Sequence, residues 1–411
     1  MPTTKATTLA HTLASTTSST ADLNYAKTLN DTGVTSTEFD KLDGLTATTN
    51  ELNLVDGSVT GPLSHRNIII NGEFKINQAG NKTGKTSGEK QMAGDRWSFD
   101  TNIGTWSGGT ENDAPTGSGF VSSGYFNCTS QATTGSSGYC IVSTRFEGQD
   151  LQHIRKGTSS AKPVTLSFWV KSPTSGTHIC ELYDGDNTRH CSQSYTISSA
   201  NTWEYKSLTF PADTTGAFDN DNGLSLYVQW WLGAGTTYTS GTLQTTWGSN
   251  TAANRAVGQV NVGGTAHSSN NYFQLTGVQL ELGSVATPFE HRGYGEELFR
   301  CQRYFYAIHK VNDGGQYMFT GYFWDTGQGL ANFQPPVSMR TSPSVISPNV
   351  TDSLRFWVAG SGNSFDYLTL NGATPQNVNM TMQGEGTGTA GNAGGVSANN
   401  DSNYLYLTAE L

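Results

Sequence analysis

Aromatic side chains in predicted loops are the residues of this sequence best suited to bind a ligand. Aromatic residues make up 11% of the chain, and nine of them are tryptophan. The flat face of an aromatic ring stacks on the C–H groups of a sugar, while neighbouring Asp, Asn and Arg side chains hydrogen-bond the hydroxyls. The loop residues that combine these types are Trp106, Tyr183, Asp184, Asp186, Asn187, Tyr238 and Trp247. We expect a saccharide-binding surface among them.

Packing is the alternative role for each of these rings, because much of the aromatic surface of proteins is simply buried. Phe168, Trp169 and Tyr227 lie in segments where apolar and polar residues alternate, so we expect these three in a core. The sequence alone leaves the place of the binding surface open.

Two acidic segments have oxygen ligands at alternating positions, as a Ca²⁺ site would require. They are Asp184-Gly185-Asp186-Asn187 and Asp219-Asn220-Asp221-Asn222. Neither is followed by the Gly and Glu that complete an EF-hand loop. Turn formation explains Asp, Asn and Gly equally well. We expect no metal and no cofactor.

Catalytic residues are not marked by spacing. A polysaccharide hydrolase needs two carboxylates about 5–9.5 Å apart across a cleft, and no pair of acidic residues stands out. The eight histidines include no His-Glu-x-x-His metal motif. We therefore expect a protein that is not an enzyme, with a depolymerase as the less favoured alternative.

Charge and hydropathy argue against nucleic acid and membranes as partners, and the cysteines indicate free thiols. The net charge is −10, and no basic stripe is present to neutralise phosphates, so we expect no nucleic acid. No run of about 18 apolar residues occurs, which argues against membrane insertion. The start, Met1-Pro2-Thr3-Thr4-Lys5-Ala6, lacks the apolar core of a secretory signal, so a role outside the cell would fit a particle that is assembled in the cytoplasm and released by lysis. We expect the cysteines to be buried free thiols, although Cys180 and Cys191 could lie side by side on a hairpin and form a disulfide. The five cysteines are Cys128, Cys140, Cys180, Cys191 and Cys301.

Short alternating segments predict a mainly β protein. Those expected to build a first sandwich are residues 67–72, 164–171, 205–211, 224–230 and 273–281. Long loops are expected at 107–120, 211–223 and 233–258, where binding residues often lie. A helix is expected over 296–305, and strands at 315–324, 353–358 and 404–411 indicate a second β-sandwich.

A short repeat near the N-terminus predicts a self-associating stalk. Residues 38–44 and 51–57 each begin with Glu and end with Gly, and a Thr stands three residues before each Glu. This is the capping-box spacing, and the closing Gly is a usual helix terminator. Helices this short need an external partner for their apolar face. The residues expected to pack between chains are Phe39, Leu42, Leu52 and Val55.

Three segments together resemble bacteriophage tail-fibre and related virion fibre proteins. They are the Thr-x-x-Glu-Leu-Asn-x-x-Asp-Gly module, residues 67–78 with 93–97, and residues 278–292 with 296–305. The resemblance implies a homotrimeric fibre that recognises the host surface, with a jelly-roll domain like that of a carbohydrate-binding module.

The resulting expectation is a virion fibre with an ordered series of parts. Residues 1–30 are expected to dock to a tail or capsid protein, 31–63 to form the helical trimeric stalk, 64–293 the jelly-roll domain and 294–411 a C-terminal β-sandwich. Its expected function is binding of host cell-surface glycan during adsorption. A decoration fibre of the capsid or tail without a ligand of its own is the alternative.

Overall fold

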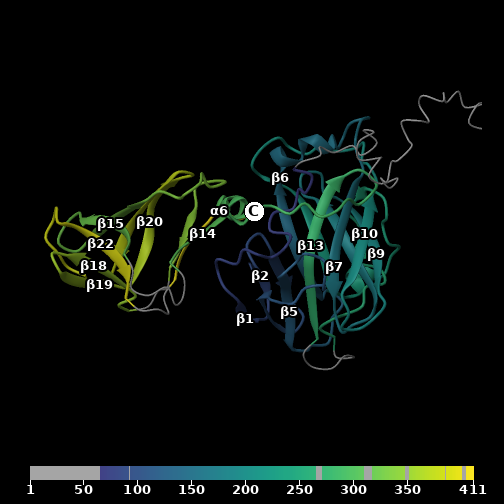
Figure 1. The fold of residues 1–411 in the computed structure, drawn as a ribbon, viewed down its shortest axis with the longest axis horizontal. Helices are drawn as coiled ribbons and strands as arrows, with labels where there is room; N and C mark the ends of the chain where they lie inside the picture. Colours follow the sequence, from purple (N-terminus) through teal and green to yellow (C-terminus); the bar gives the residue numbers. More distant parts are fainter. Residues whose placement is uncertain are drawn as a thin grey trace, which may run out of the picture. The chain divides into compact units, whose positions relative to one another are not determined.

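A computed structural model describes residues 65–91, 93–264, 271–309, 317–347, 351–384, 386–399 and 404–411. These residues are mainly β, as predicted (Figure 1). The expected docking arm and helical stalk, with Phe39, Leu42, Leu52 and Val55, lie outside the described residues.

Strands β1 to β13 form a sandwich of two antiparallel sheets. The first sheet has the order β1 (Lys82–Lys85), β4 (Thr105–Glu111), β5 (Ser123–Ser130), β13 (Tyr272–Leu282), β7 (Val164–Lys171), β10 (Glu204–Phe210). The second has the order β12 (Gly248–Ser249), β9 (Arg189–Ile197), β8 (Gly176–Asp184), β11 (Leu224–Ala234), β6 (Tyr139–Glu147), β3 (Ser98–Thr101), β2 (Gly88–Gln91). The central strands β7 and β13 pair side by side in Figure 1.

Alternation along the strands directs one row of side chains from each sheet into a shared core. Successive side chains of a strand point to opposite faces. In β11 the inward row includes Val228 and Trp230, both fully buried. Trp230 meets Phe168 of β7 in an edge contact, with ring centroids 5.6 Å apart. Rings from both sheets therefore fill the interior, and the prediction that Phe168 lies in a core is confirmed.

The segment 67–72 is buried but is not a strand. Its backbone makes isolated bonds to β13, such as Ile68 N donating to Leu280 O at 2.9 Å. The expected Asn71-Gly72 turn does form, because Phe74 N donates to Asn71 O at 3.1 Å. A Cβ on Gly72 would lie 2.2 Å from Val278 O, so only glycine fits this close approach.

Within the residues that the structure describes, four short helical elements accompany the sheets. They are η1 (Gly148–Ile154), α5 (Thr236–Thr239), η2 (Ala252–Asn254) and α6 (Tyr294–Gln302). α6 is shorter than the helix predicted over 296–305, because Phe305 already begins a strand. Within the described part of the chain, no helix is both long and apolar enough to cross a membrane.

Buried charge anchors the residues that follow α6. Glu147, at the end of β6, is fully buried and accepts hydrogen bonds from Arg303 Nε at 2.8 Å and from the Tyr304 hydroxyl at 2.5 Å. Burial alone would raise the pKa of Glu147, but the Arg303 hydrogen bond and charge lower it below its usual value.

Residues after α6 build two further antiparallel sheets. The smaller has the order β14 (Phe305–His309), β23 (Leu405–Thr408), β17 (Ser344–Ile346). The larger has the order β19 (Ser361–Phe365), β18 (Leu354–Val358), β22 (Ala393–Ala398), β15 (Tyr317–Phe323), β16 (Gly329–Phe333), β21 (Asn377–Gln383), β20 (Tyr367–Thr374). Leu405 and Leu407 of β23 share one hydrophobic core with Phe323 and Phe356 of the larger sheet. We call these two sheets the C-terminal sheet pair.

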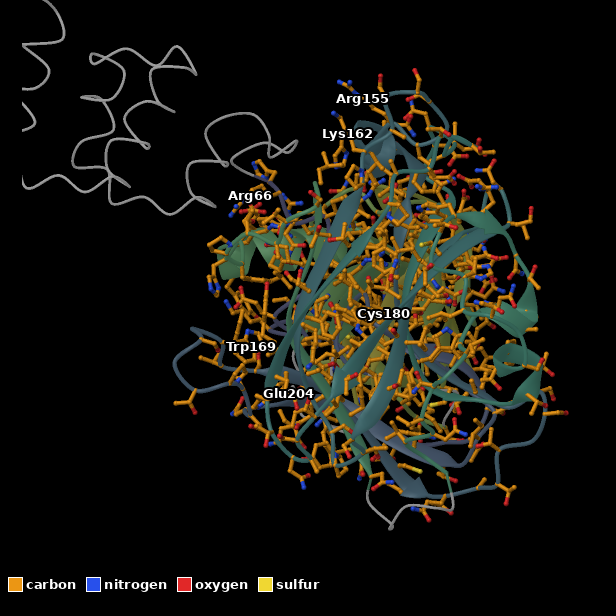
Figure 2. The ribbon with its side chains drawn as sticks, turned by 90° about the vertical axis from the view of Figure 1, so that its right-hand side faces the viewer. Arg66, Arg155, Lys162, Trp169, Cys180 and Glu204 are labelled. Carbon is orange, nitrogen blue, oxygen red and sulfur yellow. The ribbon has the colours of Figure 1, made fainter. Side chains whose placement is uncertain are left out.

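All five cysteines are buried free thiols, as the sequence analysis favoured. Cys180 and Cys191 lie on the paired strands β8 and β9 but face Gln193 and Leu182 rather than each other. Figure 2 labels Cys180 within the densely packed side chains of the sandwich. Burial raises the pKa of the Cys191 thiol to about 12, which keeps it protonated and unreactive at neutral pH.

Acid sensitivity is expected from His178, which is fully buried in β8. Burial lowers its pKa to about 4, although a hydrogen bond to Thr174 O opposes the shift. Between pH 6.5 and 4, His178 is protonated in the unfolded chain but stays neutral in the folded chain. The free energy of unfolding therefore decreases as the pH is lowered through this range. The loss reaches about 3 kcal/mol at the acid end.

Urea denaturation at a series of pH values from 4.5 to 7 measures this slope. The variant His178→Gln keeps a side-chain N–H donor but does not titrate, and its slope is expected to be shallower. Burial also lowers the pKa of His153 and His190, so a smaller slope remains. Equal slopes for the two proteins would contradict the assignment.

Candidate functional site

The outer face of the seven-stranded sheet of the sandwich carries an aromatic-lined cavity of about 350 Å³, which we call the trough. Its side chains come from β3, β6, β8 and β11 and from the segment that follows β11. The lining residues are Asp100, Tyr139, Ile141, Ser143, Arg145, Tyr183, Tyr227, Gln229, Trp231, Tyr238 and Arg255. Its size lies within the roughly 300–1,000 Å³ usual for small-molecule sites.

Strand β11 supplies the middle of the trough. Tyr227, Gln229 and Trp231 are every second residue, so they share the face opposite to Val228 and Trp230. Tyr227 pairs across the sheet with Tyr183 of β8 on one side and Arg145 of β6 on the other. The Tyr183 and Tyr227 rings meet edge to face, with centroids 5.7 Å apart. Both rings are half-buried, so part of each remains open to a ligand.

The segment 235–256 closes one side of the trough. Tyr238 lies in α5 and packs on Trp231, with ring centroids 5.1 Å apart. It also meets Tyr139 of β6 edge to face at 6.5 Å. Trp231 faces outward from the core yet is fully buried, because this segment covers it. Tyr139 and Tyr238 therefore form a wall, and Trp231 forms the floor beneath it.

An ion pair helps to hold the segment 235–256 on the sheet, in addition to the pairing of β12 with β9. Glu181 of β8 is fully buried and accepts bonds from Arg255 Nε at 2.8 Å and Nη2 at 2.9 Å. It also accepts from Trp231 Nε1 at 2.9 Å. Arg255 Nη2 donates a further bond to Gln229 Oε1 at 3.0 Å. Burial alone would lower the pKa of Arg255, but Glu181 raises it, so the guanidinium is charged at any working pH.

The Arg255 guanidinium also stacks over two rings of the trough. Its central carbon lies 5.1 Å from the centroid of Tyr183 and 5.2 Å from that of Trp231. Arg145 lies 5.0 Å from the ring of Tyr227. These contacts hold planar polar groups beside planar apolar faces. A flat ligand with an apolar face and hydroxyl groups at its edge is what this arrangement suits.

Two residues predicted for the site from the sequence, Tyr183 and Tyr238, line the trough. Trp106 was expected in a loop, and this prediction is wrong. Trp106 belongs to β4 and is fully buried, with its Nε1 donating to Ile103 O at 2.7 Å. A ring without exposed surface offers no face to a sugar. The expected loop 107–120 is shorter than predicted because β4 extends to Glu111.

The remaining predicted site residues lie outside the trough lining and hold loops together. Asp184 is fully buried and pairs with Lys156, and Asn187 Nδ2 donates to Asp184 Oδ2 at 3.0 Å. Asp186 Oδ2 accepts from the backbone of residue 219 at 2.9 Å. Trp247 Nε1 donates to the carbonyl of residue 211 at 2.9 Å. Among the described residues, no group of three or more His, Cys, Asp or Glu side chains is arranged to hold a metal ion.

Sequence reasoning missed most of the trough. Tyr227 was expected in the core but lines the trough, and Trp169 is half-buried on the outer face of β7, 5.6 Å from the ring of Tyr205. Figure 2 labels Trp169 close to Glu204, which precedes Tyr205 in the paired strand β10. The available signal was Tyr227, Gln229 and Trp231 on one face of a strand whose other face is wholly apolar.

Comparison with models of protein families and with curated proteins gave no match. Solved structures that match in part include the enzymatically active domain of bacteriophage CBA120 tailspike protein 4. That match has 12% identity, a TM-score of 0.27, and covers 53% of this chain and 21% of the tailspike chain. The family 11 carbohydrate-binding module from Clostridium thermocellum, in complex with a mixed-linked tetrasaccharide, matches with 12% identity and a TM-score of 0.25, covering 51% and 99%. TmCBM61 in complex with β-1,4-galactotriose matches with 11% identity and a TM-score of 0.26, covering 53% and 99%. These likenesses are distant and concern the fold alone.

Proposed function

We propose that the chain is a virion fibre subunit whose trough binds a glycan on the host cell surface. The observation that carries this proposal is the trough itself. It sets the half-buried rings of Tyr183 and Tyr227 beside the Arg255 guanidinium and the amide of Gln229. Sugars present C–H faces and hydroxyl edges, and this combination matches both.

Charge in the trough favours a polyhydroxylated ligand over a strongly anionic one. The positive charge of Arg255 is already neutralised by the bidentate contact with Glu181. Asp100 adds a carboxylate to the lining, and the Tyr139 hydroxyl donates to it at 3.3 Å. A phosphate or sulfate group would meet that carboxylate as well as the Arg145 guanidinium, whereas hydroxyl groups can donate to Asp100 and accept from Arg145 without repulsion.

The assignment to a fibre rests on the sequence. The repeat in residues 31–63 and the segments 67–78 and 278–305 resemble virion fibre proteins, so we propose a homotrimer held to the particle through residues 1–30. Three weak sites per fibre and several fibres per particle raise the avidity above single-site affinity by about 10²–10⁴. Weak single sites let a particle sample a surface reversibly before it is committed to infection.

The variant Tyr227→Ala is expected to weaken saccharide binding by about tenfold or more, since it removes a stacking face from the centre of the site. A panel of bacterial surface polysaccharides identifies the ligand, and titration calorimetry with its oligosaccharide measures the affinity. The matched control is Tyr205→Ala, which removes a 47% exposed tyrosine from the opposite sheet and is expected to bind as the parent does.

The alternatives predict different results in the same experiments. A decoration fibre without a ligand would bind nothing in the panel, and this would sink the adhesin proposal. New reducing ends released from a bound polysaccharide would indicate a depolymerase. Light scattering tests the oligomer separately, and a monomeric mass for the intact chain would remove the stalk from the proposal.

A further inference from the structure

A second cavity lies on the larger sheet of the C-terminal sheet pair, far along the sequence from the trough. Its volume is about 510 Å³, and we call it the amide hollow. Its lining comes from β15, β16, β20, β21 and β22. The lining residues are Thr320, Gly321, Tyr322, Leu330, Ala331, Asn332, Asn371, Asn379, Met380 and Ala393.

The strand register places two kinds of surface side by side in the amide hollow. Tyr322 of β15 is 44% exposed and stands between Leu330 of β16 and Ala393 of β22, which are its paired residues. Because Ala393 is small, one flank of the tyrosine ring is left uncovered. Asn332 of β16 pairs directly with Asn379 of β21. An apolar strip therefore runs beside a row of amides.

The third amide joins this row through an irregularity in the sheet. The register between β20 and β21 shifts between Leu370 and Gly372, and Asn371 is the extra residue. Such a bulge re-aims a side chain out of the regular alternation. Asn371 is exposed, as are Asn332 and Asn379. Three adjacent strands thus each present one asparagine to the same cavity.

These amides are available to a ligand. Among the described residues, hydrogen bonds to the protein engage none of the three side-chain amides of the hollow, which are those of Asn332, Asn371 and Asn379. Each amide has two donor hydrogens and a carbonyl acceptor. The described residues of the lining include no Asp, Glu, Lys, Arg or His, so none of them carries a fixed charge that would select for an ion. Paired amide donors and acceptors beside an open tyrosine face suit a neutral polyhydroxylated ring.

We propose that the amide hollow is a second saccharide site, selective for an uncharged sugar. Tyr322 stacks on the C–H face of the sugar, and Asn332, Asn371 and Asn379 bond its hydroxyls. The proposal goes beyond the trough, which uses arginines and a carboxylate, and it holds whether or not the trough binds glycan. Two sites of different charge in one chain would let a fibre bind two different saccharides on one cell surface.

The experiment uses the full chain with Tyr227→Ala as background, so that the trough does not contribute. The probes are xylotriose, cellotriose and β-1,4-galactotriose, with trigalacturonate as a charged probe of equal length. Binding is followed by titration calorimetry and by the side-chain amide signals in ¹H–¹⁵N spectra. We expect at least one neutral trisaccharide to bind and trigalacturonate to bind about tenfold more weakly, which is about 1.4 kcal/mol.

Two variants and one control locate the binding. Tyr322→Ala removes the stacking face, and Asn379→Asp keeps the shape but removes two donor hydrogens; each is expected to weaken the neutral probe by about tenfold. The control is Tyr317→Ala, in the same strand and 65% exposed but outside the lining, and it is expected to change nothing.

Several outcomes would overturn the proposal. One is that none of the three neutral probes binds the Tyr227→Ala background. A second is that binding occurs but is the same in Tyr322→Ala and Asn379→Asp as in the background. A third is a change in molar mass of Tyr322→Ala by light scattering, which would make the hollow a contact between copies of the chain. If the trough binds no glycan, the results expected of these three measurements on the amide hollow do not change.

Discussion

Replacing Glu181 with alanine is expected to abolish saccharide binding in the trough and to lower the free energy of unfolding by about 3–5 kcal/mol. Glu181 is fully buried and is the shared acceptor for Arg255 and Trp231. Without it, the Arg255 charge is left partly buried with no counterion, and Trp231 Nε1 loses its acceptor. The segment 235–256, which carries Tyr238, then loses its side-chain anchor beside Trp231, while β12 within the segment still pairs with β9.

Urea denaturation and titration calorimetry with the panel ligand measure the two effects of Glu181→Ala. A more conservative variant, Glu181→Gln, keeps acceptor and shape but not the charge, and we expect intermediate losses of both quantities. The control is Glu296→Ala in α6, where Glu296 pairs with Arg300 at 2.9 Å but is half-exposed. Loss of that exposed pair is expected to cost at most about 0.5 kcal/mol. Undiminished binding by Glu181→Ala would show that the wall does not depend on this ion pair.

The second large effect is expected from Lys156→Met, which should also cost about 3–5 kcal/mol of folding free energy. The Lys156 ammonium is buried, with 2% exposure, and contacts Asp184, whose side chain has none. It also lies 3.1 Å from Asp213 and donates to Gly216 O at 2.6 Å. Removal of the lysine leaves the Asp184 carboxylate buried without its cation.

A double variant distinguishes loss of the ion pair from loss of packing. In Lys156→Met with Asp184→Asn, no uncompensated charge remains at residue 184, and the new amide oxygen still accepts from Asn187. We expect this double variant to be more stable than Lys156→Met alone, as measured by urea denaturation. If the double variant is less stable than the single one, the cost does not arise from an unpaired carboxylate.

Local pattern in the sequence was enough to predict most strands of the sandwich. The predicted segments 164–171, 205–211, 224–230 and 273–281 each coincide with a strand to within a few residues. Alternation succeeds here because each strand buries only one face against the shared core. It failed at 67–72, where an apolar run is buried through side-chain and isolated backbone bonds instead of a ladder.

The residue types of the candidate site could be predicted from the sequence, but most of the individual residues that line it could not. Tyr183 and Tyr238 were identified as loop aromatics and line the trough, whereas Trp106 lies in the core. Alternation shows that Tyr227 and Trp230 face opposite ways, but it does not show which face meets the other sheet. That choice is made by contacts across the fold.

Distant contacts also decide which parts of the outer face stay open. Arg255 and Glu181 are separated by 74 residues, and only the fold brings them together. Their ion pair helps to hold the segment 235–256 over Trp231, together with the pairing of β12 with β9, and Tyr183 and Tyr227 stay at the open side. No local pattern in the sequence encodes a pairing at that separation.

The trough is tested most directly by a crystal structure of the chain with the oligosaccharide that the panel identifies. We predict a sugar ring stacked on Tyr227 or Tyr183, with hydroxyl groups bonded to Gln229, Arg145 or Asp100. Ordered saccharide found elsewhere on the sandwich, with the trough empty at saturating ligand, would contradict it.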